Sequence, residues 1–115
     1  MPNQVFEKHV WAEIDLDALR QNFRTVKQRA GALPLCAVVK ADSYGHGAVQ
    51  CARVFAEEGA AWLACSCLAE ALQLRQAGLT LPILILGHVY ASCAADLIQN
   101  HITVACYSTE QAEAL

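Results

Sequence analysis

Four short apolar runs, each followed by a pattern typical of a helix, recur along the chain at intervals of roughly 20 to 26 residues. The runs are LCAVVK (35–40), WLACS (62–66), PILIL (82–86) and ITVACY (102–107). The first is a continuous apolar run, which suits a strand covered on both faces. Strands that alternate with helices in this way predict a parallel sheet with right-handed crossovers, and therefore an α/β fold.

Helical patterns fill the segments between these runs. Ahead of the first run, VWAEIDL (10–16) alternates apolar and polar residues, which predicts a half-buried strand. Asp17 is then expected to cap a helix that Gly31 ends. The apolar stripe of that helix is Leu19, Phe23, Val26 and Ala30.

Further helices are expected after each run. Their expected places are 48–58 before Gly59, 68–77 before Gly78, a helix from near Ser92 to Asn100, and a last one opened by the capping-box pair Ser108 and Gln111.

Length decides how much of a fold these elements make. An open doubly wound sheet and a (β/α)₈ barrel share this periodicity, and both place functional groups at the carboxyl ends of the strands. A complete barrel needs about 250 residues. The 115 residues form a single domain and, on the barrel alternative, supply only about half of a barrel.

Composition excludes several classes of protein. Hydrophobic residues make up 56% and charged residues 17%, so the chain is expected to pack rather than to be disordered. The net charge of -3 leaves no basic face for nucleic acid. The N-terminus lacks the apolar core of a signal peptide, and no apolar run reaches the roughly 20 residues that span a membrane. A cytoplasmic location is therefore expected.

The six cysteines are expected to be buried and reduced, because four of them lie in strand-like runs and two in helix-like segments. The chain contains no Cys-x-x-Cys pair, and Cys65-x-Cys67 has no second pair nearby. The pattern therefore predicts neither a metal site nor a disulfide framework.

Lys40 is the residue that most needs an explanation, because it ends an apolar strand where such folds place their chemistry. One interpretation is structural: Lys40 extends to solvent or pairs with Asp42. The other is chemical, because a lysine amine can bond covalently to a carbonyl cofactor. Tyr44 is then a donor to an anionic ligand or a rim aromatic, and His46 is expected to bond to backbone in its glycine-flanked turn.

The stretch AVVKADSYGHG resembles the pyridoxal-phosphate signature of bacterial alanine racemases. The segments WAEIDLDALRQNFR, EALQLRQAG and PILILG resemble the same family, so the similarity covers essentially residues 10–115. The resemblance implies that residues 1–115 are part of an N-terminal TIM-barrel domain that binds pyridoxal 5'-phosphate. It also implies a β-rich C-terminal domain outside these residues, and a cytoplasmic homodimer that supplies D-alanine for peptidoglycan.

Three site residues follow from the resemblance. Lys40 matches the lysine that holds the cofactor covalently and acts as the base on the D-alanine side. Tyr44 matches the tyrosine that contacts the cofactor phosphate, and Leu86 falls where the family has an apolar residue near the cofactor. The family's second base and its pyridine-facing arginine lie later in the chain, and neither Tyr90 nor Tyr107 matches either role.

Two alternatives remain open at this point. The first is a racemase of other specificity, for example for serine. The second is a noncatalytic small-molecule-binding domain with an open flavodoxin-like sheet, in which Lys40 is an ordinary surface lysine.

Overall fold

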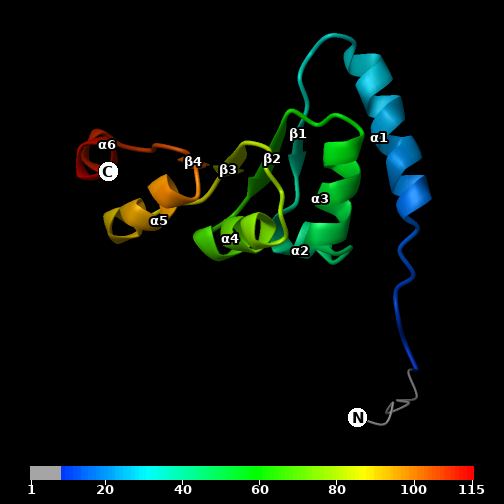
Figure 1. The fold of residues 1–115 in the computed structure, drawn as a ribbon, viewed down its shortest axis with the longest axis horizontal. Helices are drawn as coiled ribbons and strands as arrows, with labels where there is room; N and C mark the ends of the chain where they lie inside the picture. The colour runs from blue at the N-terminus through cyan, green and yellow to red at the C-terminus, as the bar shows by residue number, and fades with distance from the viewer. Residues whose placement is uncertain (1–8) are drawn as a thin grey trace.

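The computed structural model describes residues 9–115, and its centre is a four-stranded parallel sheet (Figure 1). The strands are β1 (Cys36–Val38), β2 (Trp62–Cys65), β3 (Ile83–Ile85) and β4 (Ile102–Val104). They are ordered β1-β2-β3-β4, and every neighbouring pair is parallel. The predicted α/β fold is confirmed.

Helices connect these strands in the predicted alternation. They are α1 (Leu16–Ala30), the turn α2 (Lys40–Tyr44), α3 (Ala48–Glu57), α4 (Leu68–Gln76), the 3₁₀ turn η1 (Ala91–Cys93), α5 (Ala94–Gln99) and α6 (Thr109–Ala114). The helix expected from Ser92 to Asn100 is thus a 3₁₀ turn followed by a shorter α-helix.

The strand order separates the two architectures that periodicity left open. In a doubly wound sheet the order in which successive strands are added reverses at a switch point, and this reversal places helices on both faces. Here each strand lies beside the one before it, so right-handed crossovers put the helices on one face and make the sheet curl. The chain forms the first part of a (β/α)₈ barrel, and an open flavodoxin-like sheet is excluded.

The core lies between the sheet and its helices. Leu63 and Cys65 of β2 and Ile83 and Ile85 of β3 are all fully buried on this side. The helices contribute buried small and apolar side chains, including Ala52, Ala71 and Leu74. Every second residue of the two central strands therefore packs against the helices.

The opposite face of the sheet is open, which corrects the expectation for residues 35–40. The paired row Val38, Ala64, Leu84 and Thr103 lies on this face; Val38 is 36% exposed and Thr103 is exposed, whereas the small side chain of Ala64 is buried. None of the three residues of β1 is buried: Cys36 and Val38 are exposed and Ala37 is partly buried, so β1 is not covered on both faces. The radius of gyration of 16.7 Å exceeds the roughly 13 Å of a compact chain of this length.

The segment before α1 differs from the prediction. Residues 10–15 are exposed and form no strand, because an alternating strand needs a neighbour and none of the described residues pairs with it. Helix α1 begins two residues earlier than expected: Asp15, not Asp17, is the N-cap, and its Oδ1 accepts from the amides of Asp17 (2.9 Å) and Ala18 (3.1 Å). The helix ends at Gly31, as predicted.

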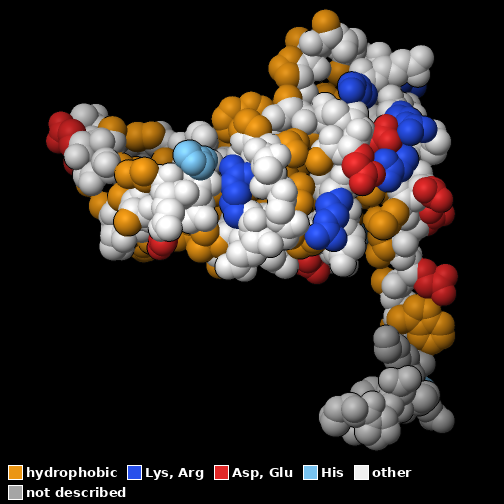
Figure 2. Space-filling model, viewed as in Figure 1, with side chains coloured by type: hydrophobic (Ala, Val, Ile, Leu, Met, Phe, Trp, Pro, Cys, Tyr) orange, Lys and Arg blue, Asp and Glu red, His pale blue; other side chains and the backbone are white. Residues whose placement is uncertain are grey.

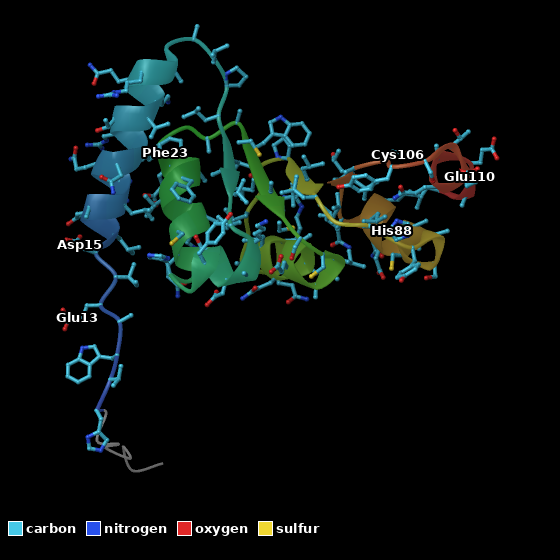
Figure 3. The ribbon with its side chains drawn as sticks, turned by 180° about the vertical axis from the view of Figure 1, so that it is seen from behind. Glu13, Asp15, Phe23, His88, Cys106 and Glu110 are labelled. Carbon is cyan, nitrogen blue, oxygen red and sulfur yellow. The ribbon has the colours of Figure 1, made fainter. Side chains whose placement is uncertain are left out.

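Only part of the apolar stripe of α1 is buried. Phe23 is buried and its ring lies 5.4 Å from that of Phe55 in α3, between the two helices (Figure 3). Val26 stays 55% exposed. Charged side chains gather over α1 and α3 instead (Figure 2), so this contact combines one aromatic pair with ion pairs.

The capping-box prediction for α6 is confirmed with a shift of one residue. Ser108 is the N-cap and its Oγ accepts from the Gln111 amide at 3.0 Å. The Gln111 side chain accepts from the amide of Tyr107, one residue before the cap, at 2.8 Å. Both contacts satisfy amides that the helix itself leaves without partners.

Candidate functional site

The carboxyl ends of the four strands meet at one edge of the sheet, which we call the rim. The ladder hydrogen bonds continue one residue past the strands: Val39 donates to the Ala64 carbonyl and Leu86 to the Cys65 carbonyl, both at 2.8 Å. Lys40 therefore leaves β1 beside Ser66 at the end of β2, and Leu86 stands on the other side of Ser66. Two of the predicted site residues, Lys40 and Leu86, are thus brought to the same rim.

The chain after Lys40 forms a left-handed turn. Ala41, Asp42, Ser43 and Tyr44 have φ between 51° and 56°, and Gly45 follows at 86°. A left-handed conformation costs roughly 1–2 kcal/mol for each residue with a Cβ. Four such residues in succession require contacts that hold them, and strain of this kind is concentrated at functional sites.

Hydrogen bonds inside the turn supply part of that support. The Ser43 amide donates to the Val39 carbonyl (3.0 Å), and the Gly45 amide donates to the Ala41 carbonyl (3.1 Å). Asp42 Oδ1 accepts from the Ala48 amide at 2.8 Å, which joins the turn to the start of α3. Ser43 is buried, so the turn is packed against the body of the domain.

Glu70 of α4 supplies the rest, and the sequence did not point to it. Its Oε2 accepts from the Ala41 amide at 2.8 Å. Its Oε1 accepts from the Ser66 amide at 2.7 Å and from the Ser66 hydroxyl at 2.5 Å. Burial raises the pKa of the Glu70 carboxyl, but these hydrogen bonds outweigh burial and hold it below its usual value. A glutamate in the first turn of a helix is too common to be recognised as a site residue from its position.

Lys40 is half-buried, and among residues 9–115 its amine has neither an ion pair nor a hydrogen bond. The expected alternative partner, Asp42, is occupied by the Ala48 amide. The interpretation of Lys40 as half of an ion pair with Asp42 is therefore wrong. The arrangement leaves a lysine amine available at the rim.

The neighbours of Lys40 in sequence take different roles. Tyr44 is 60% exposed, and its hydroxyl has no hydrogen-bond partner within the described residues. His46 Nδ1 lies 3.0 Å from the Ser43 carbonyl oxygen, which confirms the predicted contact with backbone. Gly45 and Gly47 both have positive φ and carry the chain from the turn into α3. The glycines therefore serve the turn geometry.

Both backbone polar groups of Leu86 are hydrogen-bonded, which fixes its position at the rim. Its amide donates to Cys65, and its carbonyl accepts from the Tyr107 hydroxyl. Next to it, a Cβ on Gly87 would lie 2.4 Å from the Ser66 carbonyl oxygen. Glycine at this position therefore lets the ends of β2 and β3 approach each other. The loops that follow β3 and β4 carry His88 and Cys106 (Figure 3).

The cysteines differ in burial, which corrects part of the prediction. All six are free thiols. Cys51 and Cys65 are buried as expected, and burial raises the pKa of the Cys65 thiol to about 12. Cys36, Cys67 and Cys106 are exposed, because they lie on the open sheet face, at a helix start and after the last strand. The part of the chain that the structure covers contains no His, Cys, Asp and Glu grouping suited to a metal ion.

No helix within residues 9–115 is both long enough and apolar enough to cross a membrane. The sheet order and the lysine-bearing rim define the class of protein: part of an α/β barrel with a lysine at the carboxyl end of β1 whose amine has no partner among residues 9–115. Within that class, the family model for the alanine racemase N-terminal domain matches residues 14–115, and the chain belongs to this family.

Named relatives agree with this assignment. The chain is 49% identical over 112 residues to an alanine racemase of Desulfovibrio desulfuricans, covering 96% of this chain and 30% of that one. An alanine racemase of Clostridium perfringens is 44% identical over 106 residues, with 92% and 28% covered. The chain thus spans about 30% of the length of the curated relatives that it matches.

Solved structures show the same relationship. Alanine racemase of Clostridium difficile 630 superposes with a TM-score of 0.89 at 42% identity, covering 96% of this chain and 29% of that one. Alanine racemase of Bacillus anthracis with bound L-Ala-P gives 0.88 at 35% identity, with 96% and 29% covered. The expected resemblance, and the expected assignment to the first part of a barrel, are confirmed.

Proposed function

We propose that the protein carrying this chain is a pyridoxal-phosphate-dependent alanine racemase, and that residues 1–115 are part of its cofactor-binding barrel domain. The observation that supports this most is Lys40 at the strand end, half-buried and with no partner for its amine in the described part of the chain, in a chain of this family. Four consecutive left-handed residues follow Lys40, and backbone strain of this kind is concentrated at functional sites.

The residues at the rim fit such a cofactor. Lys40 offers an amine for a covalent bond to a carbonyl carbon, and four residues later Tyr44 offers an unpartnered hydroxyl that can donate to a phosphate. Leu86 offers an apolar contact from the neighbouring strand end. When bound, the cofactor supplies a conjugated ring that accepts electron density from the substrate α-carbon.

Lys40 has two tasks in this proposal. Its Nζ holds the cofactor, and once displaced by the substrate amine it takes the α-proton on the D-alanine side or returns it. Inversion also requires a base on the opposite face. Tyr107 is not that base, because its hydroxyl donates to the Leu86 carbonyl. As the resemblance to the family implies, we place the second base in a β-rich C-terminal domain of a homodimer partner.

Two further parts of the proposal concern the cell. D-alanine is the product that would enter peptidoglycan precursors, and the enzyme would work in the cytoplasm. Both rest on membership of the family.

The proposal is tested by trapping. The complete gene product would be incubated with pyridoxal phosphate and reduced with borohydride, and the pyridoxyl group would then be mapped by mass spectrometry. Residues 1–115 contain three lysines, Lys8, Lys27 and Lys40. Lys27 is the internal control, because its Nζ already donates to the Glu58 carbonyl at 2.9 Å. We expect label at Lys40; equal label at Lys27 and Lys40 would reject the proposed site.

Substrate class is tested in parallel with chiral chromatography. L-alanine and L-serine would be offered separately, and D-alanine is expected to form faster than D-serine. A protein that labels at Lys40 but prefers serine would keep the site and reject the substrate.

A further inference from the structure

Glu70 joins two rim segments that are far apart in sequence. One carboxylate oxygen accepts from the Ala41 amide at 2.8 Å, and the other accepts from the amide and the hydroxyl of Ser66, at 2.7 and 2.5 Å. Ala41 follows β1 and Ser66 follows β2. A single side chain from α4 therefore fixes the separation between the ends of two neighbouring strands.

The Ala41 contact acts on the peptide bond next to Lys40, the residue that is proposed to hold the cofactor. The Ala41 amide belongs to the peptide plane that begins at the carbonyl carbon of Lys40. Because a peptide plane is rigid, holding its N–H fixes ψ of Lys40 and so the direction in which the Lys40 side chain leaves the backbone. Ala41 is also the first left-handed residue, with φ of 51°.

The other end of the turn is held separately. Asp42 Oδ1 accepts from the Ala48 amide at 2.8 Å, which secures the turn to α3. Glu70 is thus the contact that secures its beginning, from a different helix. Its carboxylate is partly buried and makes three short hydrogen bonds, so it is a fixed acceptor rather than a solvated surface charge.

A simpler role for Glu70 is capping of its own helix. A glutamate three positions into a helix commonly reaches back to the amides at the helix start. The Ser66 contacts fit that role, but the Ala41 contact does not, because Ala41 lies 29 residues earlier and in another element. The two carboxylate oxygens divide these tasks.

We propose that Glu70 is a positioning residue for Lys40: its carboxylate locks the peptide plane after Lys40 and thereby sets the orientation of the amine at the rim. The contact itself stands on the geometry of this chain. The consequence for the cofactor rests on the proposed function.

Glu70→Gln tests the proposal, because it keeps the size of the side chain and replaces one of the two acceptor oxygens with a donor. Asp96→Asn is the matched control: Asp96 is also an acid in the first turn of a helix, and its carboxylate accepts no hydrogen bond within the described residues. Both changes remove one negative charge. Both variants would be made in the complete gene product.

Two measurements are made on each variant. Amide hydrogen exchange is expected to become roughly tenfold to a hundredfold faster at Ala41 in Glu70→Gln, because the charged acceptor of the Ala41 amide is replaced by a neutral side chain that has only one acceptor oxygen for Ala41 and Ser66 together. The visible circular dichroism of the bound cofactor is measured before reduction and divided by the amount that borohydride then traps at Lys40. This ratio is expected to fall, because an achiral chromophore gives such a signal only when it is held in one orientation. Asp96→Asn should match the wild type in both.

The outcomes separate the two proposals. Unchanged exchange at Ala41 would overturn the positioning role, and so would faster exchange with an unchanged dichroism signal. If the wild-type protein traps no cofactor at Lys40, the proposed function is rejected and the exchange rates alone decide on Glu70.

One measurement on the wild type does not depend on a variant that folds. The amide proton resonances of Ala41 and Ser66 should both titrate with one common midpoint, since they donate to the same carboxylate. Separate midpoints, or no titration of Ala41, would overturn the proposal.

Discussion

Arg24 and Glu58 form a two-pronged ion pair between α1 and the end of α3. Arg24 Nε donates to Glu58 Oε2 at 2.7 Å, and Arg24 Nη2 donates to Oε1 at 2.9 Å. Arg20 adds a third hydrogen bond to the same carboxylate, at 2.7 Å. The hydrogen bonds from Arg24 and Arg20 lower the pKa of Glu58 to about 2.

This ion pair predicts a loss of stability in acid. A carboxylate whose pKa is depressed in the folded state stabilises that state above its unfolded pKa, near 4.5, and the contribution is lost as pH falls toward 2. Glu58→Gln should lower the thermal midpoint by a few degrees at pH 7 and flatten its dependence on pH between about 4.5 and 2. Thermal melts at several pH values measure both effects. An unchanged acid profile in Glu58→Gln would contradict the prediction.

Removal of the Arg75 guanidinium is expected to destabilise the fold through lost hydrogen bonds to backbone. Its guanidinium donates to four backbone carbonyls, of Leu79 (2.8 Å), Leu81 (2.7 Å), Asn100 (2.8 Å) and His101 (3.1 Å), and so joins the segments that precede β3 and β4. Arg75→Met leaves these acceptors without their donor and should cost about 2 kcal/mol of unfolding free energy.

Urea denaturation measures this cost, and Arg53→Met is its control. Arg53 is exposed, and within the described residues its guanidinium makes one hydrogen bond, to the Ala77 carbonyl at 3.3 Å. Its loss should therefore change stability little. Equal effects of the two substitutions would show that the Arg75 contacts contribute nothing special.

Gly87 predicts a steric effect at the rim. A methyl group there would lie 2.4 Å from the Ser66 carbonyl oxygen, which is backbone and cannot move aside without shifting β2. Gly87→Ala should therefore cost about 1–3 kcal/mol and weaken trapping of the cofactor at Lys40. Gly31→Ala is the comparison, because its Cβ meets open space and only the positive φ of 64° is strained. If Gly87→Ala traps cofactor like the wild type, the close approach has no bearing on the site.

Lys40 predicts the largest effect on activity. Lys40→Arg keeps the positive charge but cannot form the covalent bond or take up the α-proton, so racemisation of alanine should fall by roughly a hundredfold to ten-thousandfold. Lys27→Arg should retain wild-type activity, because Lys27 lies on α1, where its Nζ donates to the Glu58 carbonyl, and not at the rim. A chiral assay of the complete gene product decides; a Lys40→Arg protein with normal rates would remove Lys40 from the mechanism.

Residues 1–115 by themselves are expected to racemise no alanine. The sheet exposes one face and the edges of β1 and β4, and the proposed second base lies outside this segment. The isolated segment should also bind a dye that reports exposed apolar surface, in contrast to the complete gene product. Enzyme-like racemisation by the isolated segment would contradict this expectation.

Local patterns in the sequence were sufficient to predict the strands and most of the helices, and to place Lys40 at the end of a strand. The continuous apolar runs at β1 to β4 and the glycines after α1, α3 and α4 are local signals, because strand burial and helix termination depend on neighbouring residues. The motif around Lys40 was sufficient to indicate the family.

The strand order, the missing strand at 10–15 and the support of the turn after Lys40 depend on contacts between segments that are far apart in the sequence. The order of the strands selects a barrel over a doubly wound sheet, and no local pattern contains that order. The segment 10–15 has a strand pattern but no neighbour to pair with. The left-handed turn after Lys40 opposes local preference and is held by Glu70, whose carboxylate reaches Ala41 across 29 residues of chain. Sequence periodicity reports which residues share a face, whereas such a contact exists only once the strands lie side by side.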